Sequence, residues 1–256
     1  CSVSQVLNGH PRAQSLRPET RAKILAAAKE LGYCRNELAA SVARRRGNVL
    51  GFVSGEMGGV EYTGRIQNGV LDAASERGYT VSVYHLGGSS NDEIIRQLIG
   101  WRVAGVIFHV PSLELIEKIT KRLDDQGIVW GTVNLSNPGG IGVTSDDASG
   151  VESAVRLLHE YGHRNIVFLG NRNSVPHGLA EYQVRRESGF RQGMAKYYPD
   201  RVPALYHMKD TQSFQDACYM RELGETFIRK DVDGVICESD VFASVLSRAV
   251  FAAGYT

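Results

Sequence analysis

From Asn48 onward, short apolar runs alternate with longer amphipathic stretches, and this alternation restricts the fold more than any other feature of the sequence. A short apolar run bounded by polar residues is typical of a buried strand, and apolar residues three or four positions apart are typical of a helix. Strands that alternate with helices form parallel sheets covered on both faces. We therefore expect an α/β fold whose ligands bind beyond the carboxyl ends of the strands.

Six runs fit the strand pattern and six stretches fit the helix pattern. The predicted strands are residues 49–53, 79–84, 103–108, 128–133, 165–170 and 233–237. The predicted helices are residues 62–77, 92–100, 112–126, 148–161, 182–198 and 214–229. The glycine-rich segment 55–59 follows the first predicted strand but lacks the GxGxxG spacing of dinucleotide-binding loops, so a phosphate-binding loop is not predicted there.

The first 46 residues differ from the rest of the chain in charge. They contain nine Lys and Arg residues against three Glu residues, a net charge of +6, whereas the remaining 20 basic and 25 acidic residues give a net charge of −5. A basic segment joined to a mildly acidic body indicates a separate polyanion-binding module, because its cations displace the counterions condensed on phosphates. The alternative is a basic surface helix without a partner.

The basic segment itself reads as short helices. Residues 18–32 fit one helix, because Pro18 suits a first turn, the apolar residues between keep helical spacing and Gly32 suits a helix end. Residues 36–45 repeat the pattern, and the fragment VSQVLNG (3–9) fits the tail of an earlier helix.

Five segments resemble one known family in the order in which they occur along the chain. They are VSQVLNG (3–9), PETRAKILAAAKELGY (18–33), NELAASVARRRGNVLGFV (36–53), TSDDASGVESAVRLLHEYGHRNIVFLG (144–170) and RRESGFRQGM (185–194). Together they resemble the LacI/GalR family of bacterial transcriptional repressors. The resemblance covers essentially the whole chain.

The resemblance implies a domain organisation. Residues 1–46 would be an all-α helix-turn-helix headpiece, truncated so that Cys1 lies inside the recognition helix, followed by a hinge helix. Residues 47–256 would form a periplasmic-binding-protein-like, effector-binding core of two parallel-sheet subdomains, about 47–163 and about 164–256, the second one incomplete. The chain would then be a fragment truncated at both ends.

The resemblance also assigns contacts to DNA. Cys1 and Gln5 match positions that face base edges in the major groove, where glutamine can pair bidentately with adenine. Residues at phosphate-contacting positions are Ser2, Ser4, Asn8, Thr20 and Arg21. In the hinge helix, Asn36 follows Arg35 where the family usually has proline, and Val42 replaces the leucine that commonly wedges into the minor groove, which predicts weaker bending. For Ser4 and Asn8 the alternative is a hydrogen bond to the local backbone only.

Four residues match positions of the family's effector pocket. Arg186, three residues before Gly189, matches an arginine that grips ligand hydroxyls or carboxylates, and a guanidinium offers several fixed donors for this. Asn134 and Asp240 follow predicted strands, and Tyr62 could add an aromatic wall. The alternatives are an ion pair for Arg186, a helix N-cap for Asp240 and core packing for Tyr62.

Catalytic and metal chemistry have little support in the sequence. The four cysteines are scattered without metal-ligand spacing, and the seven histidines are dispersed with no GxSxG or HExxH motif. The adjacent Asp146 and Asp147 favour helix capping over paired-carboxylate chemistry. We find no signal peptide and no apolar run of membrane-spanning length, so a reducing cytoplasm is the preferred location and no cofactor or metal is expected.

These observations predict a dimeric, ligand-responsive, sequence-specific DNA-binding regulator that acts as a repressor, recognises a pseudo-palindromic operator and senses a sugar or similar small polar metabolite. Two other classes remain open. A periplasmic-type sugar-binding protein has the same core without a headpiece. The other is a Rossmann-type enzyme, whose unfolding temperature a nucleotide would raise.

Overall fold

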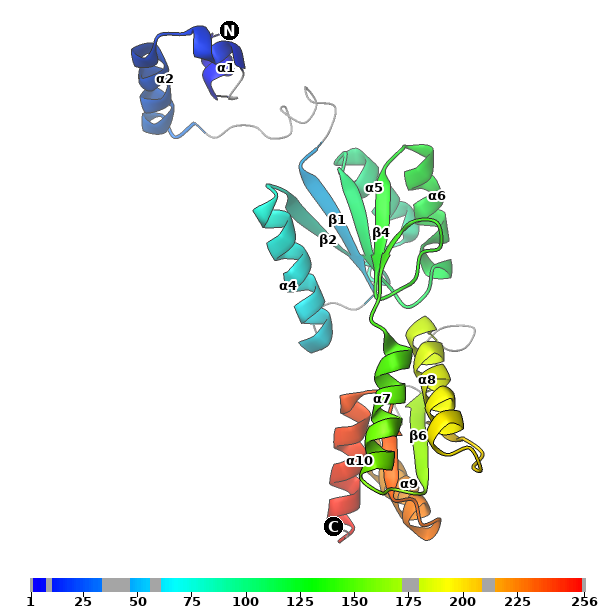
Figure 1. Ribbon diagram of the computed structural model, residues 1–256. Helices are drawn as coiled ribbons and strands as arrows, with labels where there is room; N and C mark the ends of the chain where they lie inside the picture. Colours follow the sequence, from blue (N-terminus) through cyan, green and yellow to red (C-terminus); the bar gives the residue numbers. More distant parts are fainter. Residues whose placement is uncertain are drawn as a thin grey trace.

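The computed structural model describes residues 2–7, 11–33, 47–55, 61–171, 180–208 and 215–254. They form a small helical unit, the headpiece (residues 2–33), and two α/β lobes that follow it in a row (Figure 1). The first lobe comprises residues 47–143 and the second lobe residues 147–254. In the described ranges, no helix combines the length and the apolar character that a bilayer crossing requires.

The headpiece consists of α1 (Ser2–Leu7), the 3-10 helix η1 (Pro11–Ser15) and α2 (Pro18–Glu30). Helix α1 packs against both other elements. Pro18 lies in the first turn of α2, and Gly32 beyond its end has a φ of 60°, a conformation that glycine adopts readily. The helix predicted over residues 18–32 is therefore confirmed, whereas the one predicted over residues 36–45 lies outside the described residues.

The first lobe is built on a five-stranded parallel sheet with the order β2-β1-β3-β4-β5. Its strands are β1 (Val49–Ser54), β2 (Thr80–His85), β3 (Gly105–His109), β4 (Val129–Val133) and β5 (Ile141–Val143). Its helices are α4 (Glu61–Glu76), α5 (Asn91–Gly100), η2 (Glu114–Ile116) and α6 (Glu117–Asp125).

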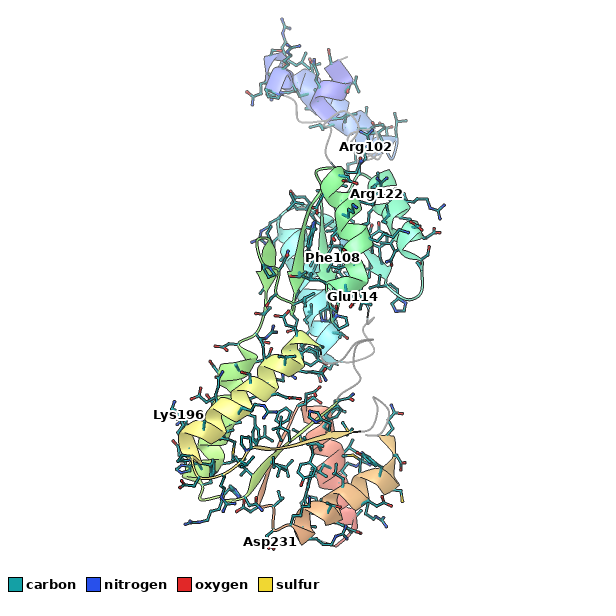
Figure 2. The ribbon with its side chains drawn as sticks, turned by 90° about the vertical axis from the view of Figure 1, so that its right-hand side faces the viewer. Arg102, Phe108, Glu114, Arg122, Lys196 and Asp231 are labelled. Carbon is teal, nitrogen blue, oxygen red and sulfur yellow. The ribbon has the colours of Figure 1, made fainter. Side chains whose placement is uncertain are left out.

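The helices of the first lobe cover the sheet unequally. Ile94 and Leu98 of α5, Ile119 of α6 and Phe108 of β3 are fully buried in one core cluster, and Figure 2 shows Phe108 in the middle of the lobe. On the other side of the sheet from α5 and α6 lies α4 (Figure 1), which buries only two side chains, Thr63 and Ala74.

The second lobe has a three-stranded parallel sheet with the order β7-β6-β8. Its strands are β6 (Ile166–Asn171), β7 (Ala204–Met208) and β8 (Gly234–Cys237), and its helices are α7 (Asp147–Glu160), α8 (Glu181–Tyr197), α9 (Ala217–Arg229) and α10 (Asp240–Ala252). Successive residues of β6 point to opposite faces. Phe168 joins a core with α7 and α8, and Leu169 joins a core with α9 and α10.

The structure changes the predicted organisation in two respects. Strands β5 and β7 and helix α10 were not predicted, and β5 has only three residues, too few to form a recognisable apolar strand run. The boundary near residue 163 is also displaced. Val155 of α7 is fully buried in the second lobe's core, so the chain crosses between the lobes before Asp147, ahead of this helix rather than after it.

Candidate functional site

Each sheet has one place where the strand order changes direction, between β1 and β3 in the first lobe and between β6 and β8 in the second. Ligands of open α/β sheets bind in the crevice outside the carboxyl ends of the strands at such a point. Figure 1 shows that α7 and α8 both begin at the end of the second lobe that faces the first. The polar residues at the two carboxyl edges are therefore the candidate site.

In the first lobe, Ser54 and His109 are the last residues of β1 and β3 and are paired in the strand register. Both are buried, and Ser54 Oγ lies 3.3 Å from His109 Nδ1. The ring of Tyr62 packs edge-on against His109 with 6.0 Å between ring centroids and is 48% exposed. Tyr62 therefore lies at the surface beside the carboxyl end of β3 and not in the core, and the core-packing alternative is wrong.

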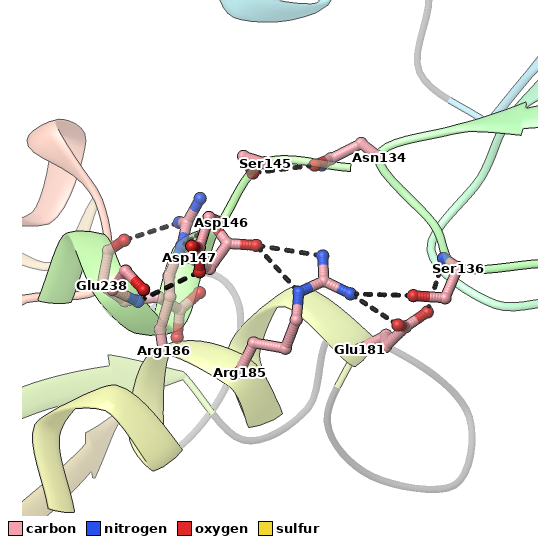
Figure 3. Close-up of polar contacts among 10 residues, drawn as sticks. Asn134, Ser136, Ser145, Asp146, Asp147, Glu181, Arg185, Arg186 and Glu238 are labelled. Atoms are coloured by element: carbon pink, nitrogen blue, oxygen red, sulfur yellow. Dashed lines mark hydrogen bonds and ion pairs between the residues drawn. The ribbon is translucent and has the colours of Figure 1, made fainter. Parts of the chain in front are cut away.

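In the second lobe, Arg186 of α8 lies beside Glu238, the residue that follows β8, and contacts three residues, of which Figure 3 labels Asp147 and Glu238. Its Nε donates to Asp147 Oδ1 at 3.0 Å, and its Nη1 donates to the carbonyl oxygen of Glu238 at 2.7 Å. Its Cζ lies 5.0 Å from the ring centroid of Tyr182. The ion pair predicted as the alternative for Arg186 is therefore present, and within the described part of the chain its Nη2 has no hydrogen bond.

Asp147 forms ion pairs with two arginines, Arg185 and Arg186. Its side chain is 4% exposed, its Oδ1 accepts from Arg186, and its Oδ2 accepts from Nε and Nη2 of Arg185 at 3.1 and 3.0 Å. The neighbouring Asp146 caps α7, because it accepts a hydrogen bond from the backbone N–H of Ser149. The expected capping role is thus confirmed for Asp146, whereas Asp147 forms an ion-pair network.

Behind Arg186 lies a buried polar network around Glu238, the residue that follows β8. Its Oε2 accepts from the backbone N–H of Asn171, and its Oε1 accepts from Nε2 of Gln183, both at 2.8 Å. Burial raises the pKa of Glu238 above its ordinary value, while the hydrogen bonds from Asn171 and Gln183 and the charge of Arg186 oppose this. A Cβ on Gly170 would lie 3.0 Å from Glu238 Oε2, so this glycine leaves room for the carboxylate.

Asn134 and Asp240 take different places. Asn134 follows β4 in the left-handed region, with a φ of 63°, and its Oδ1 lies 3.5 Å from Ser145 Oγ as a hydrogen-bond acceptor. Asp240 is exposed at the first position of α10, where its Oδ1 accepts from the backbone N–H of Val241. The N-cap predicted as an alternative for Asp240 is instead Ser239, whose side chain accepts from the backbone N–H of Phe242.

The headpiece residues fall on two helices that pack together. Ser2, Ser4 and Gln5 lie on α1, and Thr20 and Arg21 lie in the first turn of α2. The other residues assigned to DNA contacts lie outside the described residues: Cys1, Asn8, Asn36 and Val42.

Several residues of the candidate site were not predicted from the sequence: Ser54, His109, Asn171, Gln183, Arg185 and Glu238. The first three end strands, and Glu238 directly follows one, so a systematic reading of strand ends beside the two switch points would have found them. Gln183 and Arg185 give no such signal, because their partners lie on other elements.

The comparisons with known proteins agree with this fold. A model of the family "periplasmic binding protein-like domain" matches residues 155–256. The HTH-type transcriptional regulator CelR of Thermobifida fusca is 28% identical over 99% of this chain and 74% of its own. The chain is thus similar to an HTH-type transcriptional regulator over nearly its whole length.

Solved structures of LacI/GalR proteins share the fold. The Lac repressor bound to ONPG in its repressed state superposes with a TM-score of 0.78 and 19% identity, over 100% of this chain and 75% of that one. A LacI family transcriptional regulator from Enterococcus faecium with bound ribose gives a TM-score of 0.64 and 19% identity, over 81% and 73%. The match to CelR, a transcriptional regulator, extends over nearly the whole chain.

Proposed function

We propose that this protein belongs to the LacI/GalR family and is a ligand-responsive transcriptional regulator that binds a pseudo-palindromic operator as a cytoplasmic homodimer, acts as a repressor and has no catalytic activity. One observation carries the proposal: a basic helical headpiece precedes two α/β lobes in one chain, and the similarity to CelR covers both parts. The two-fold symmetry of a dimer explains why the operator would be palindromic.

The headpiece supplies the DNA contacts in this proposal. Gln5 on α1 can hydrogen-bond to an adenine edge, whereas Ser2, Ser4, Thr20 and Arg21 suit phosphate oxygens. The net charge of +6 over residues 1–46 adds affinity that is independent of sequence and falls as salt displaces the protein from phosphates. The described residues of this set lie on one packed unit of α1 and α2, which supports a common role.

The crevice between the carboxyl edges supplies the effector site. Arg186 offers a guanidinium edge whose other nitrogens are fixed, which suits hydroxyl groups held in one orientation. Tyr62 offers an aromatic face with a polar tip on the opposite lobe, an arrangement that sugars favour. We assign Asn134 and Asp240 to the rim of this site, and a sugar bound between the lobes would change the relative populations of their orientations.

Selection from a random DNA library at about 0.15 M salt tests the proposal, since specific sites typically bind at about 10⁻⁸ to 10⁻¹¹ M there. We expect recovery of a pseudo-palindrome, and a thermal-shift screen of sugars that includes ribose should raise the unfolding temperature of the same protein. Sugar binding without any DNA preference would support the periplasmic-type sugar-binding alternative instead. Stabilisation by a nucleotide alone would support the Rossmann-type enzyme.

A further inference from the structure

A polar contact joins the two lobes beside the crevice (Figure 3). The backbone N–H of Ser136 donates to Glu181 Oε2 at 2.9 Å, and Arg185 Nη1 donates to Ser136 Oγ at 3.5 Å. Ser136 is fixed in the first lobe because the preceding residue, Leu135, is 3% exposed and belongs to that lobe's core. Glu181 and Arg185 lie one turn apart on α8, which is anchored in the second lobe by the buried Phe190.

All three nitrogens of the Arg185 guanidinium donate hydrogen bonds to carboxylates. Its Nη1 contacts Glu181 Oε1 at 2.5 Å, and its other two nitrogens bind Asp147. The exposed fractions of the Arg185, Glu181 and Asp147 side chains are 21%, 34% and 4%. A network of this kind is less screened by water and salt than an ion pair on an open surface. It therefore holds Glu181 in the position from which it accepts the Ser136 N–H.

The same network reaches the effector site through Asp147. One carboxylate oxygen accepts from Arg185, which holds the lobe contact, and the other accepts from Arg186. We propose that Arg185 is a positioning residue that fixes the relative orientation of the two lobes through Glu181 and Ser136, and that Asp147 makes this orientation depend on Arg186. The role given to Arg186 as the ligand clamp rests on the proposed function, whereas the lobe contact does not.

The dependence on Arg186 has a direct physical basis. Arg186 contacts Asp147, Glu238 and Tyr182, which all belong to the second lobe, and within the described part of the chain it has no hydrogen bond or ion pair with the first lobe. A carboxylate shared by two guanidinium groups reorients when one of them moves, because its two oxygens are fixed to each other. A ligand that moves Arg186 would thus change how Arg185 is held.

The experiment measures the distance between the lobes without any ligand. Spin labels on Lys121→Cys of α6 and Arg191→Cys of α8, both exposed positions, report this distance by pulsed electron paramagnetic resonance in a chain whose native cysteines are replaced by alanine. We expect Arg185→Met to broaden the distance distribution about twofold and Arg185→Lys to restore part of the sharp distribution. Arg156→Met is the matched control, because Arg156 and Glu160 form an i,i+4 pair on α7 about half exposed to solvent.

Arg186→Met tests the coupling through Asp147, and it should also shift the distribution. A distribution unchanged by Arg185→Met, in a variant whose far-ultraviolet circular dichroism shows a folded chain, would overturn the lobe-positioning role. A change in Arg185→Met without any change in Arg186→Met would overturn the coupling. Because no ligand or DNA is added, neither result depends on whether the proposed function is correct.

Discussion

Gly189 of α8 lies so close to Ala148 of α7 that a Cβ on the glycine would come within 2.2 Å of the alanine's carbonyl oxygen. One turn further along α8, a Cβ on Gly193 would lie 2.7 Å from Cβ of Val155. The two glycines thus allow the backbone of α8 to lie directly against α7 where the helices cross. This crossing brings Arg186 to Asp147, so the geometry of the candidate site depends on residues that contact no ligand.

Gly189→Ala should destabilise the second lobe by about 1–3 kcal/mol, in the range of overpacked cores, because backbone atoms of Ala148 cannot move as a flexible side chain would. Gly150→Ala is the control on α7, where a Cβ meets nothing within 4 Å and helix propensity predicts a gain of about 0.5–1 kcal/mol. Urea unfolding of both variants checks this. Equal free energies of unfolding for Gly189→Ala and Gly150→Ala would contradict the close approach of α7 and α8.

Arg186→Ala should lower the affinity for the effector by about 10- to 100-fold, the loss of a hydrogen bond from a charged group, as measured by titration calorimetry. It should also lower the stability of the second lobe, because Asp147 and the carbonyl of Glu238 lose a donor. Arg156→Ala is the control for loss of an arginine on the same lobe. Unchanged affinity would remove Arg186 from the site.

Glu238→Gln should change how stability depends on pH. Burial raises the folded-state pKa of Glu238 above 4.5, so the folded chain holds this proton more tightly than the unfolded chain does. The group's contribution is fully present below pH 4.5 and is lost as pH rises through the folded-state pKa. The stability of the wild type relative to Glu238→Gln should therefore fall with rising pH in urea titrations, and a rise would show that the folded-state pKa is lowered.

Asp233→Asn should give the opposite slope. Burial opposes ionisation of Asp233, but hydrogen bonds from the backbone N–H groups of Arg164 and Asn165 outweigh it and lower its pKa below 3.8. Its contribution is present above pH 3.8 and is lost as pH falls through the folded-state pKa. Acid unfolding of the wild type should therefore be steeper than that of the variant. Parallel acid transitions would show that Asp233 makes no such contribution.

The alternation of apolar runs and amphipathic stretches predicted most of the fold, because buried parallel strands have a strong apolar signal. Strand β5 was not predicted because its run, Ile141 to Val143, has only three residues, and α7 was assigned to the wrong lobe because a periodic helix does not show which sheet it covers. Arg186 was predicted as a site residue from the family resemblance, and the structure places it beside the carboxyl end of β8, where it binds Asp147 and the carbonyl of Glu238. Asp147 was not predicted as a site residue, because its partners Arg185 and Arg186 lie 38 and 39 residues away in the sequence and contact it only where α7 and α8 cross.

The unequal covering of the first sheet has a consequence for local opening. Helix α4 buries only Thr63 and Ala74, whereas α5 on the other face buries Ile94, Ile95 and Leu98. Segments that bury few apolar side chains open at a lower free energy than the whole domain does. Backbone amides of α4 should therefore exchange with deuterium well before those of α5, and the two faces of one sheet should differ in the time for which they stay closed.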